Sequence, residues 1–144
     1  MGWMVVRVRG TIHARHDIVE TLHHLHLNRP NHATVLPENP VMRGMLTRVQ
    51  GYVTWGEADA ATLGALLEAR GETTDGGRLA AGAETTEIAK AVADLGLLAA
   101  DGLKPLFRLR APQGGWRSTK KPFARGGALG YRGAKINELV RRML

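Results

Sequence analysis

The first half of the chain contains three short runs rich in β-branched and other apolar residues, each followed by residues that favour turns. Residues 4–8, 33–36 and 52–55 are these runs, and each has the length and composition of a strand. A glycine or a proline comes soon after each run, as expected where a strand gives way to a loop. We therefore predict three strands in this half of the chain.

Two stretches between these strands place apolar residues at helical spacing. In the first, Ile18, Leu22 and Leu25 recur at i, i+4 and i+7, which forms one apolar stripe on a helix. Asp17, followed by a glutamate three residues later, is typical of a capping box and predicts the start of this helix. Residues 41–49 return to helical spacing. The predicted order of elements is therefore β-α-β-α-β.

The first predicted strand has two chemically different faces. Side chains alternate across a strand, so Met4, Val6 and Val8 form one apolar face. We expect this face to lie under the two helices. The opposite face would then carry Arg7 and Arg9 outward to solvent.

The second half of the chain predicts one more strand and three more helices. Apolar spacing predicts helices over residues 63–70, 85–95 and 136–143, and a strand over residues 106–110. Residues 111–133 are rich in glycine and basic side chains, with aromatic residues between them. We expect this segment to be an irregular loop that lets its backbone approach a neighbouring molecule closely.

Together these elements predict an α+β fold in a single domain, which suits a chain of 144 residues. We expect a ferredoxin-like β-α-β-α-β core, with a small, mostly antiparallel sheet and two helices on one face. Residues 1–56 would form this core. Residues 57–102 would form an acidic helical insertion, and residues 103–144 a basic strand, loop and helix packed on the core.

Charge is distributed unevenly over these three segments. Their net charges are +3, −6 and +10, and the whole chain carries +7. The last segment, residues 103–144 at +10, repels itself unless it meets an anionic partner, such as RNA, DNA or an acidic membrane surface. The alternative is that the segment is a basic tail surrounded by solvent.

Arginine and lysine side chains in this setting are candidates for contact with phosphate groups. Arginines on strands have an alternative role, because charges at a sheet edge discourage aggregation. The candidates for RNA binding lie on the predicted strands, the second helix and the basic loops. They are Arg7, Arg9, Arg15, Arg43, Arg48, Arg108, Arg110, Arg117, Lys120, Lys121, Arg125 and Arg132.

The sequence offers little for catalysis. It contains no cysteine, its one serine is Ser118 in the basic loop, and no phosphate-binding GxxxxGK[ST] loop occurs. His23, His24 and His26 cluster on the first helix without the spacing of a metal site, so we interpret them as surface residues. We expect no enzyme activity, cofactor, metal or small-molecule substrate. No apolar run approaches the roughly 20 residues of a membrane span, and we expect no membrane partner.

Two segments of the chain resemble one protein family. Residues 21–53 read Thr-Leu-x-x-Leu-x-Leu-x-Arg-x-x-His-x-Thr, then, after ten residues, Met-Leu-x-x-Val-x-x-Tyr-Val. This pattern is similar to that of the universal large-subunit ribosomal protein number thirty family. Residues 107–143 are similar to the C-terminal run of the archaeal and eukaryotic members. The missing basic N-terminal extension favours an archaeal-type form, related to eukaryotic ribosomal protein L-seven.

The resemblance implies an α/β sandwich and a structural role in the large ribosomal subunit, in the cytoplasm. It also implies binding to large-subunit ribosomal RNA, near the 5S RNA and neighbouring ribosomal proteins. The sequence leaves two other functions open. One is a small-molecule-binding regulatory domain on a ferredoxin-like fold, which that fold alone would permit. The other is an architectural protein that prefers duplex DNA.

Overall fold

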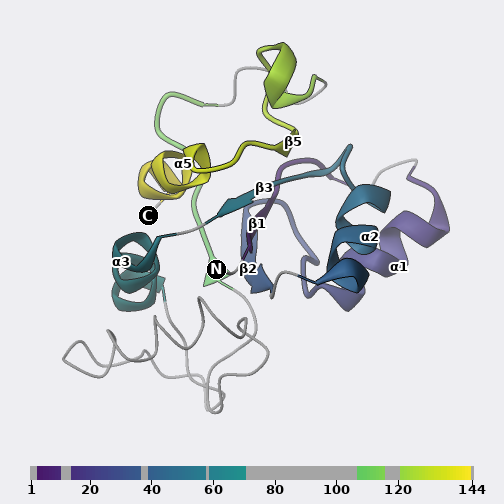
Figure 1. The fold of residues 1–144 in the computed structure, drawn as a ribbon, viewed down its shortest axis with the longest axis horizontal. Helices are drawn as coiled ribbons and strands as arrows, with labels where there is room; N and C mark the ends of the chain where they lie inside the picture. Colours follow the sequence, from purple (N-terminus) through teal and green to yellow (C-terminus); the bar gives the residue numbers. More distant parts are fainter. Residues whose placement is uncertain are drawn as a thin grey trace.

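A five-stranded sheet lies between two pairs of helices in the computed structural model (Figure 1). The structure describes residues 3–10, 14–36, 39–57, 59–70, 107–115 and 121–143. The strands are β1 (Trp3–Arg7), β2 (His32–Leu36), β3 (Val53–Glu57), β4 (Phe107–Arg108) and β5 (Gly130–Tyr131). The helices are α1 (His16–His24), α2 (Pro40–Arg48), α3 (Ala60–Arg70) and α5 (Lys135–Met143), with a short 3-10 helix η2 (Phe123–Arg125).

The strand order is β4-β2-β1-β3-β5, so β4 and β5 form the two edges of the sheet. All neighbouring strands are antiparallel except β3 and β5, which are parallel. The predicted β-α-β-α-β order and the mostly antiparallel sheet are therefore confirmed. The predicted helix over residues 85–95 lies outside the described residues.

The helices α1 and α2 cover the face of the sheet that carries the odd-numbered side chains of β1. Trp3 and Val5 are buried there with Leu22 and Leu25 from the end of α1 and Leu46 from α2. The apolar stripe predicted for the first helix is therefore confirmed. The expectation that the even-numbered face lies under these two helices is wrong.

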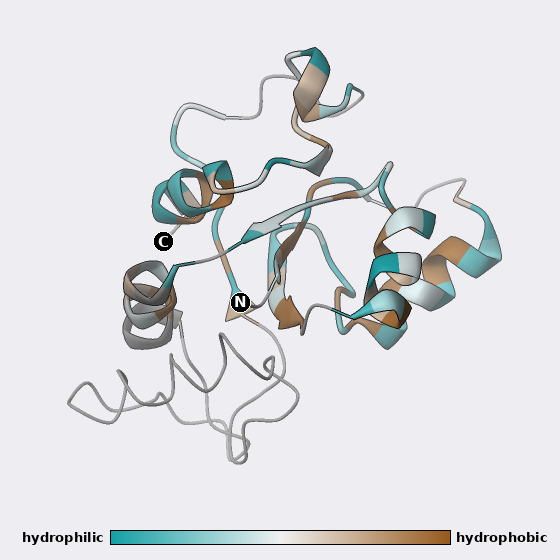
Figure 2. Ribbon diagram, in the orientation of Figure 1, coloured by the Kyte–Doolittle hydropathy of each residue, from teal (hydrophilic) through white to brown (hydrophobic). Residues whose placement is uncertain are grey.

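The even-numbered face of β1 is covered instead by α3 and α5. Met4 and Val6 pack with Leu63 and Leu66 of α3, and with four apolar side chains of α5. Figure 2 shows hydrophobic residues on the side of α5 towards the sheet and hydrophilic ones on its outer side. Because both faces of the sheet are covered, β1 is apolar on both sides, which makes its two faces hard to tell apart from sequence.

Arg7 is buried, so the prediction that it points outward to solvent is wrong. Its exposed fraction is 3%. Its guanidinium donates one hydrogen bond from Nε to the Arg9 carbonyl (2.9 Å) and one from Nη1 to the Leu27 carbonyl (2.8 Å). Burial lowers the pKa of Arg7 from its ordinary value. The side chain joins β1 to the segment that follows α1.

The helix starts differ from the predicted capping box. Arg15, not Asp17, is the N-cap residue of α1, and its side chain makes no capping hydrogen bond. By contrast, Asn39 caps α2 by accepting the Met42 amide hydrogen (2.8 Å). Asp59 caps α3 in the same way. Proline begins α2 at a position where its missing N–H costs nothing.

The helix α5 is hydrogen-bonded to the junction between β3 and α3. The Asn137 side chain accepts a hydrogen bond from the Asp59 amide (2.9 Å) and donates one to the Glu57 carbonyl (3.2 Å). A side chain at Gly56 would collide with the carbonyl of Gly133, so only glycine allows this close approach. The division of the chain at residues 56 and 102 stays a prediction.

Candidate nucleic-acid interface

The structure separates the predicted RNA-binding cations by burial. Arg7 and Arg132 are buried, at 3% and 9% exposed. Arg117 and Lys120 lie outside the described residues. The remaining eight are exposed or half-buried: Arg9, Arg15, Arg43, Arg48, Arg108, Arg110, Lys121 and Arg125.

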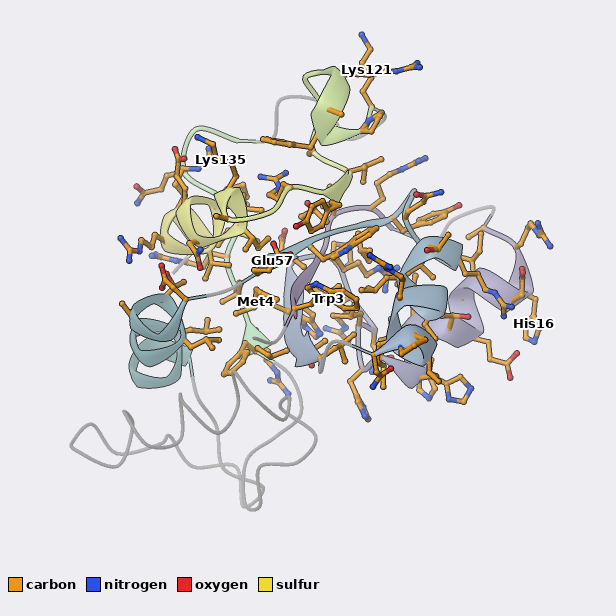
Figure 3. The ribbon with its side chains drawn as sticks, in the orientation of Figure 1. Trp3, Met4, His16, Glu57, Lys121 and Lys135 are labelled. Atoms are coloured by element: carbon orange, nitrogen blue, oxygen red, sulfur yellow. The ribbon has the colours of Figure 1, made fainter. Side chains whose placement is uncertain are left out.

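The exposed cations do not form one patch. Arg108 lies on β4, at one edge of the sheet, whereas Lys121 and Arg125 lie in the loop that leads to β5, at the other edge. His16, the neighbour of Arg15, lies at the opposite end of the molecule from Lys135 (Figure 3). Arg15 also forms an ion pair with Asp17 (3.3 Å). The basic side chains near β5 are therefore a separate group.

The buried side chain of Arg132 contacts both β3 and the loop beside β5. Its Nε donates to the Thr54 hydroxyl (2.8 Å) and its Nη2 to the Ala128 carbonyl (2.8 Å). Its guanidinium also lies 4.7 Å from the centre of the Phe123 ring, a cation–π contact. These contacts tie the loop to β3 and hold the charge of Arg132 in place.

The loop itself closes on its own backbone. The Phe123 amide donates to the Leu129 carbonyl (2.7 Å), and the Leu129 amide donates to the Lys121 carbonyl (3.2 Å). A side chain at Gly127 would collide with that same Lys121 carbonyl. The side chains of Lys121 and Arg125 on this turn are exposed to solvent. Figure 3 shows Lys121 pointing away from the rest of the molecule.

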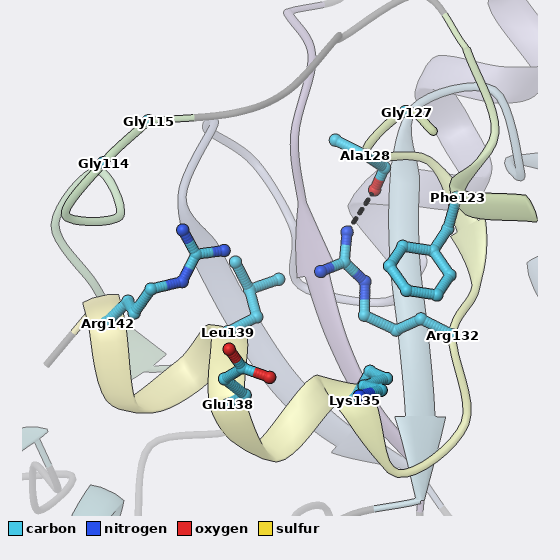
Figure 4. A pocket seen from close by; sticks show the side chains of 10 residues that line it. All are labelled: Gly114, Gly115, Phe123, Gly127, Ala128, Arg132, Lys135, Glu138, Leu139 and Arg142. Carbon is cyan, nitrogen blue, oxygen red and sulfur yellow. Dashed lines mark hydrogen bonds between the residues drawn. The ribbon is translucent and has the colours of Figure 1, made fainter. Parts of the chain in front are cut away.

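A cavity of about 520 Å³ lies between this loop, α5 and the turn at Gly114 (Figure 4). We call it the basic pocket, because three cations and one carboxylate line it. These are Arg132, Lys135, Arg142 and Glu138. The surplus of two positive charges favours an anion.

Two arginines of the basic pocket approach it from opposite walls. In Figure 4 the guanidinium groups of Arg132 and Arg142 point to the same side of α5, into the space between Gly114 and Ala128. Arg142 donates from Nη1 to the Gln113 carbonyl (3.1 Å), while its buried Nε has no partner among the described residues. A planar guanidinium group matches the oxygens of a phosphate group.

The sequence prediction omitted Lys135 and Arg142. Arg142 lies at the C-terminal end of the helix predicted over residues 136–143, where a cation complements the helix dipole without any ligand. The missed signal is that both residues lie on the polar side of a strongly amphipathic helix, next to a glycine-rich basic loop. Their meeting with residues 114 and 132 depends on the fold.

Within the described segments, no group of three or more His, Asp or Glu side chains is placed to hold a metal ion. The Nδ1 atom of His23 lies 2.9 Å from the Asn28 side-chain oxygen, which occupies that ring nitrogen. His16 and His24 lie 3.9 and 4.0 Å from the Glu20 carboxylate. No described helix is long and apolar enough to cross a membrane.

The fold and the basic pocket define the class of the protein: an α+β sandwich with a ferredoxin-like core and a cationic pocket at one edge of the sheet. Comparison with known proteins gives a more specific result. Residues 3–53 match the family model described as "Ribosomal protein L30p/L7e". This match spans the β-α-β-α unit and the start of β3.

Curated relatives extend the similarity to the whole chain. Large ribosomal subunit protein uL30 of Methanosphaera stadtmanae is 40% identical, over 99% of both chains. The protein of the same name from Methanococcus vannielii is 41% identical over the full length of both. That from Korarchaeum cryptofilum is 42% identical over 97% of this chain and 93% of its own. The chain therefore belongs to the uL30 family of ribosomal proteins, a family of structural proteins rather than enzymes.

Proposed function

We propose that this chain is a cytoplasmic, structural constituent of the large ribosomal subunit that binds ribosomal RNA through the basic pocket and the loop beside it. The observation that carries this proposal is the gathering of Arg132, Lys135 and Arg142 around one cavity. Lys121 and Arg125 extend the positive surface from the cavity onto the adjoining turn. The names of the full-length relatives support a ribosomal role.

The physical basis is neutralisation of phosphate charge. Each cation that contacts a phosphate releases a condensed counterion from the RNA, which makes binding favourable at low salt. Arginine forks also bind phosphate oxygens in pairs, so they fix the orientation of the backbone as well as its charge. Arg132 needs no ordering on binding, because its hydrogen bonds already hold it.

The other exposed cations of the predicted set remain proposed phosphate contacts. They stand on separate parts of the surface, which suits an RNA that passes around the protein rather than one bound at a single point. Arg7 is the exception, because its donors are directed at backbone carbonyls inside the fold. Proximity to 5S ribosomal RNA and to other ribosomal proteins is part of the same proposal.

A binding titration tests the proposal directly. The purified chain would be titrated with large-subunit ribosomal RNA at two salt concentrations, with tRNA and duplex DNA as competitors. We expect binding that weakens with salt but survives both competitors. Binding that any polyanion abolishes would contradict a specific ribosomal role.

A further inference from the structure

A second cavity, of about 390 Å³, lies on the other side of β5 from the basic pocket. We call it the aromatic pocket. Its lining includes Trp3, Trp55 and Tyr131, together with Glu57 and Arg43. Its volume falls within the roughly 300–1,000 Å³ typical of small-molecule pockets.

Strand register explains why these side chains meet. Trp3 is paired with Glu57, and Trp55 is paired with Tyr131, so the four residues share one face of the sheet. The helix α2 covers this face and brings Arg43 to the cavity. Because β5 is an edge strand, the cavity opens at the margin of the sheet.

The aromatic pocket presents ring surface to solvent. Tyr131 is 52% exposed, and among the large apolar side chains of the described residues only Val41 is more exposed. The centres of the Trp55 and Tyr131 rings are 6.3 Å apart, and their planes are tilted by 55°. Exposed aromatic rings beside cations are the groups on which proteins stack unpaired bases.

The polar groups of this cavity favour one kind of base. The Tyr131 hydroxyl lies 2.5 and 2.7 Å from the two oxygens of the Glu57 carboxylate and donates its one hydrogen to that carboxylate, which holds it at the ring edge. An ionised carboxylate only accepts hydrogen bonds, and its two oxygens keep free lone pairs for further donors. Guanine presents two adjacent donors, N1–H and the N2 amino group. Adenine and cytosine present an amino group beside a ring nitrogen that accepts, and uracil presents an N–H but no amino group.

Consecutive side chains connect the two cavities. Tyr131 lines the aromatic pocket and Arg132 lines the basic pocket, because neighbouring residues of an extended strand point to opposite faces. A nucleic-acid strand that crosses the β5 edge would therefore have a phosphate site on one side and a base site on the other.

We infer that the aromatic pocket holds an unpaired guanine of the bound RNA, stacked on the exposed Tyr131 ring, with the tilted Trp55 ring beside it and its donor edge at Glu57. Arg43, at the rim, lies where the phosphate of that nucleotide would be. This inference rests on the proposed function, because it assumes that the RNA lies along the β5 edge.

The experiment compares the wild type with Tyr131→Ala and Glu57→Gln in binding to large-subunit ribosomal RNA. Tyr131→Ala should weaken binding by roughly 5- to 100-fold, the usual loss of one base stack. The dependence of binding on salt should stay the same, because no cation is removed. Tyr131→Phe keeps the ring but loses the hydroxyl that holds Glu57, so its affinity should lie between those of wild type and Tyr131→Ala. Val41→Ala is the matched control: it truncates an exposed apolar side chain outside the pocket and should bind within about twofold of wild type.

Chemical probing of the RNA identifies the base. A dicarbonyl reagent that reacts with N1 and N2 of unpaired guanine should find one guanine protected by the wild type and reactive with Tyr131→Ala and Glu57→Gln. Thermal unfolding confirms that the variants fold. Wild-type binding without this protection, or with equal affinity of Tyr131→Ala, would overturn the inference and leave the proposed function intact. A variant that keeps its RNA affinity but loses a neighbouring ribosomal protein would also overturn it. Absence of specific wild-type binding would overturn the proposed function itself.

Discussion

The two layers of helices on the sheet use their basic side chains differently. On the α1 and α2 side, cations are separate: Arg15 is paired with an aspartate, and Arg7 is buried against carbonyls. On the α5 side, three cations and a basic loop surround one cavity. The comparison teaches that the placement of charge, rather than its amount along the sequence, defines the candidate interface.

The layer of α3 and α5 includes one very close backbone contact, between β3 and the start of α5, and breaking it should have the largest effect. Gly56→Ala would drive a methyl group into the Gly133 carbonyl at the start of α5. We expect the free energy of unfolding to fall by about 3 kcal/mol, the upper range for overpacking. Gly64→Ala is the control, because among the described residues no atom beyond its chain neighbours and its own helix backbone lies within 4 Å of the added methyl group, and alanine favours a helix. Urea unfolding of both variants checks this, and equal stability of the two would contradict the close contact.

The buried arginine of the first layer should matter for stability. Arg7→Met leaves the Arg9 and Leu27 carbonyls without their donor. Leaving buried polar groups unpaired should lower the free energy of unfolding by about 2 kcal/mol. Arg48→Met changes an exposed arginine and should stay within about 0.5 kcal/mol. If chemical denaturation ranked the two variants in the opposite order, the assignment of Arg7 to the interior would be wrong.

A smaller effect is expected at the start of α3, which joins the second layer. The Asp59 carboxylate accepts the Thr62 amide hydrogen (2.7 Å) and caps the helix. Asp59→Ala should lower the free energy of unfolding by about 1 kcal/mol. Asp59→Asn can still cap the helix, so its free energy of unfolding should fall much less. Thermal melts of the pair test the cap, and a loss shared equally by both variants would count against it.

The smallest expected effect is a dependence of stability on pH through His32, on β2. Burial, and then the charges of Arg108, Arg29 and Arg7, hold the pKa of His32 below its ordinary value of 6.5. Below pH 6.5, His32 therefore binds a proton more readily in the unfolded chain than in the folded one. The free energy of unfolding should fall as the pH is lowered from that value. His32→Phe should flatten this part of the stability–pH profile. A profile unchanged by the substitution would exclude His32 as the cause.

Local patterns were enough to predict most elements of this fold. Strand and helix periods identified β1 to β4 and α1, α2, α3 and α5, since each depends on its own residues and turn signals. They missed β5 and η2, which lie in the segment predicted to be an irregular loop. They could not predict which face of β1 each helix pair covers, because Val5 and Val6 are equally apolar. Nor could they predict that Arg7 and Arg132 are buried. The Leu27 and Ala128 carbonyls that accept their hydrogen bonds are brought into reach only by the folded backbone.

The basic pocket illustrates the same limit. Its lining comes from the turn at Gly114, the loop at Gly127 and the helix at Arg142, and no short motif joins them. The density of glycine and cations over residues 111–133 indicated a binding segment. The contribution of α5 required the packing of that helix on the sheet.

The salt dependence of RNA binding tests the basic pocket most directly. Lys135→Gln combined with Arg142→Gln removes two cations from the pocket. Arg29→Gln combined with Arg141→Gln removes the same charge from exposed positions outside it. The slope of log affinity against log salt is negative, and we expect its magnitude to decrease by nearly two units for the first pair of substitutions. For the second pair it should change little. Equal slopes for the two pairs would mean that the RNA responds to total charge alone, and the account of the basic pocket would be wrong.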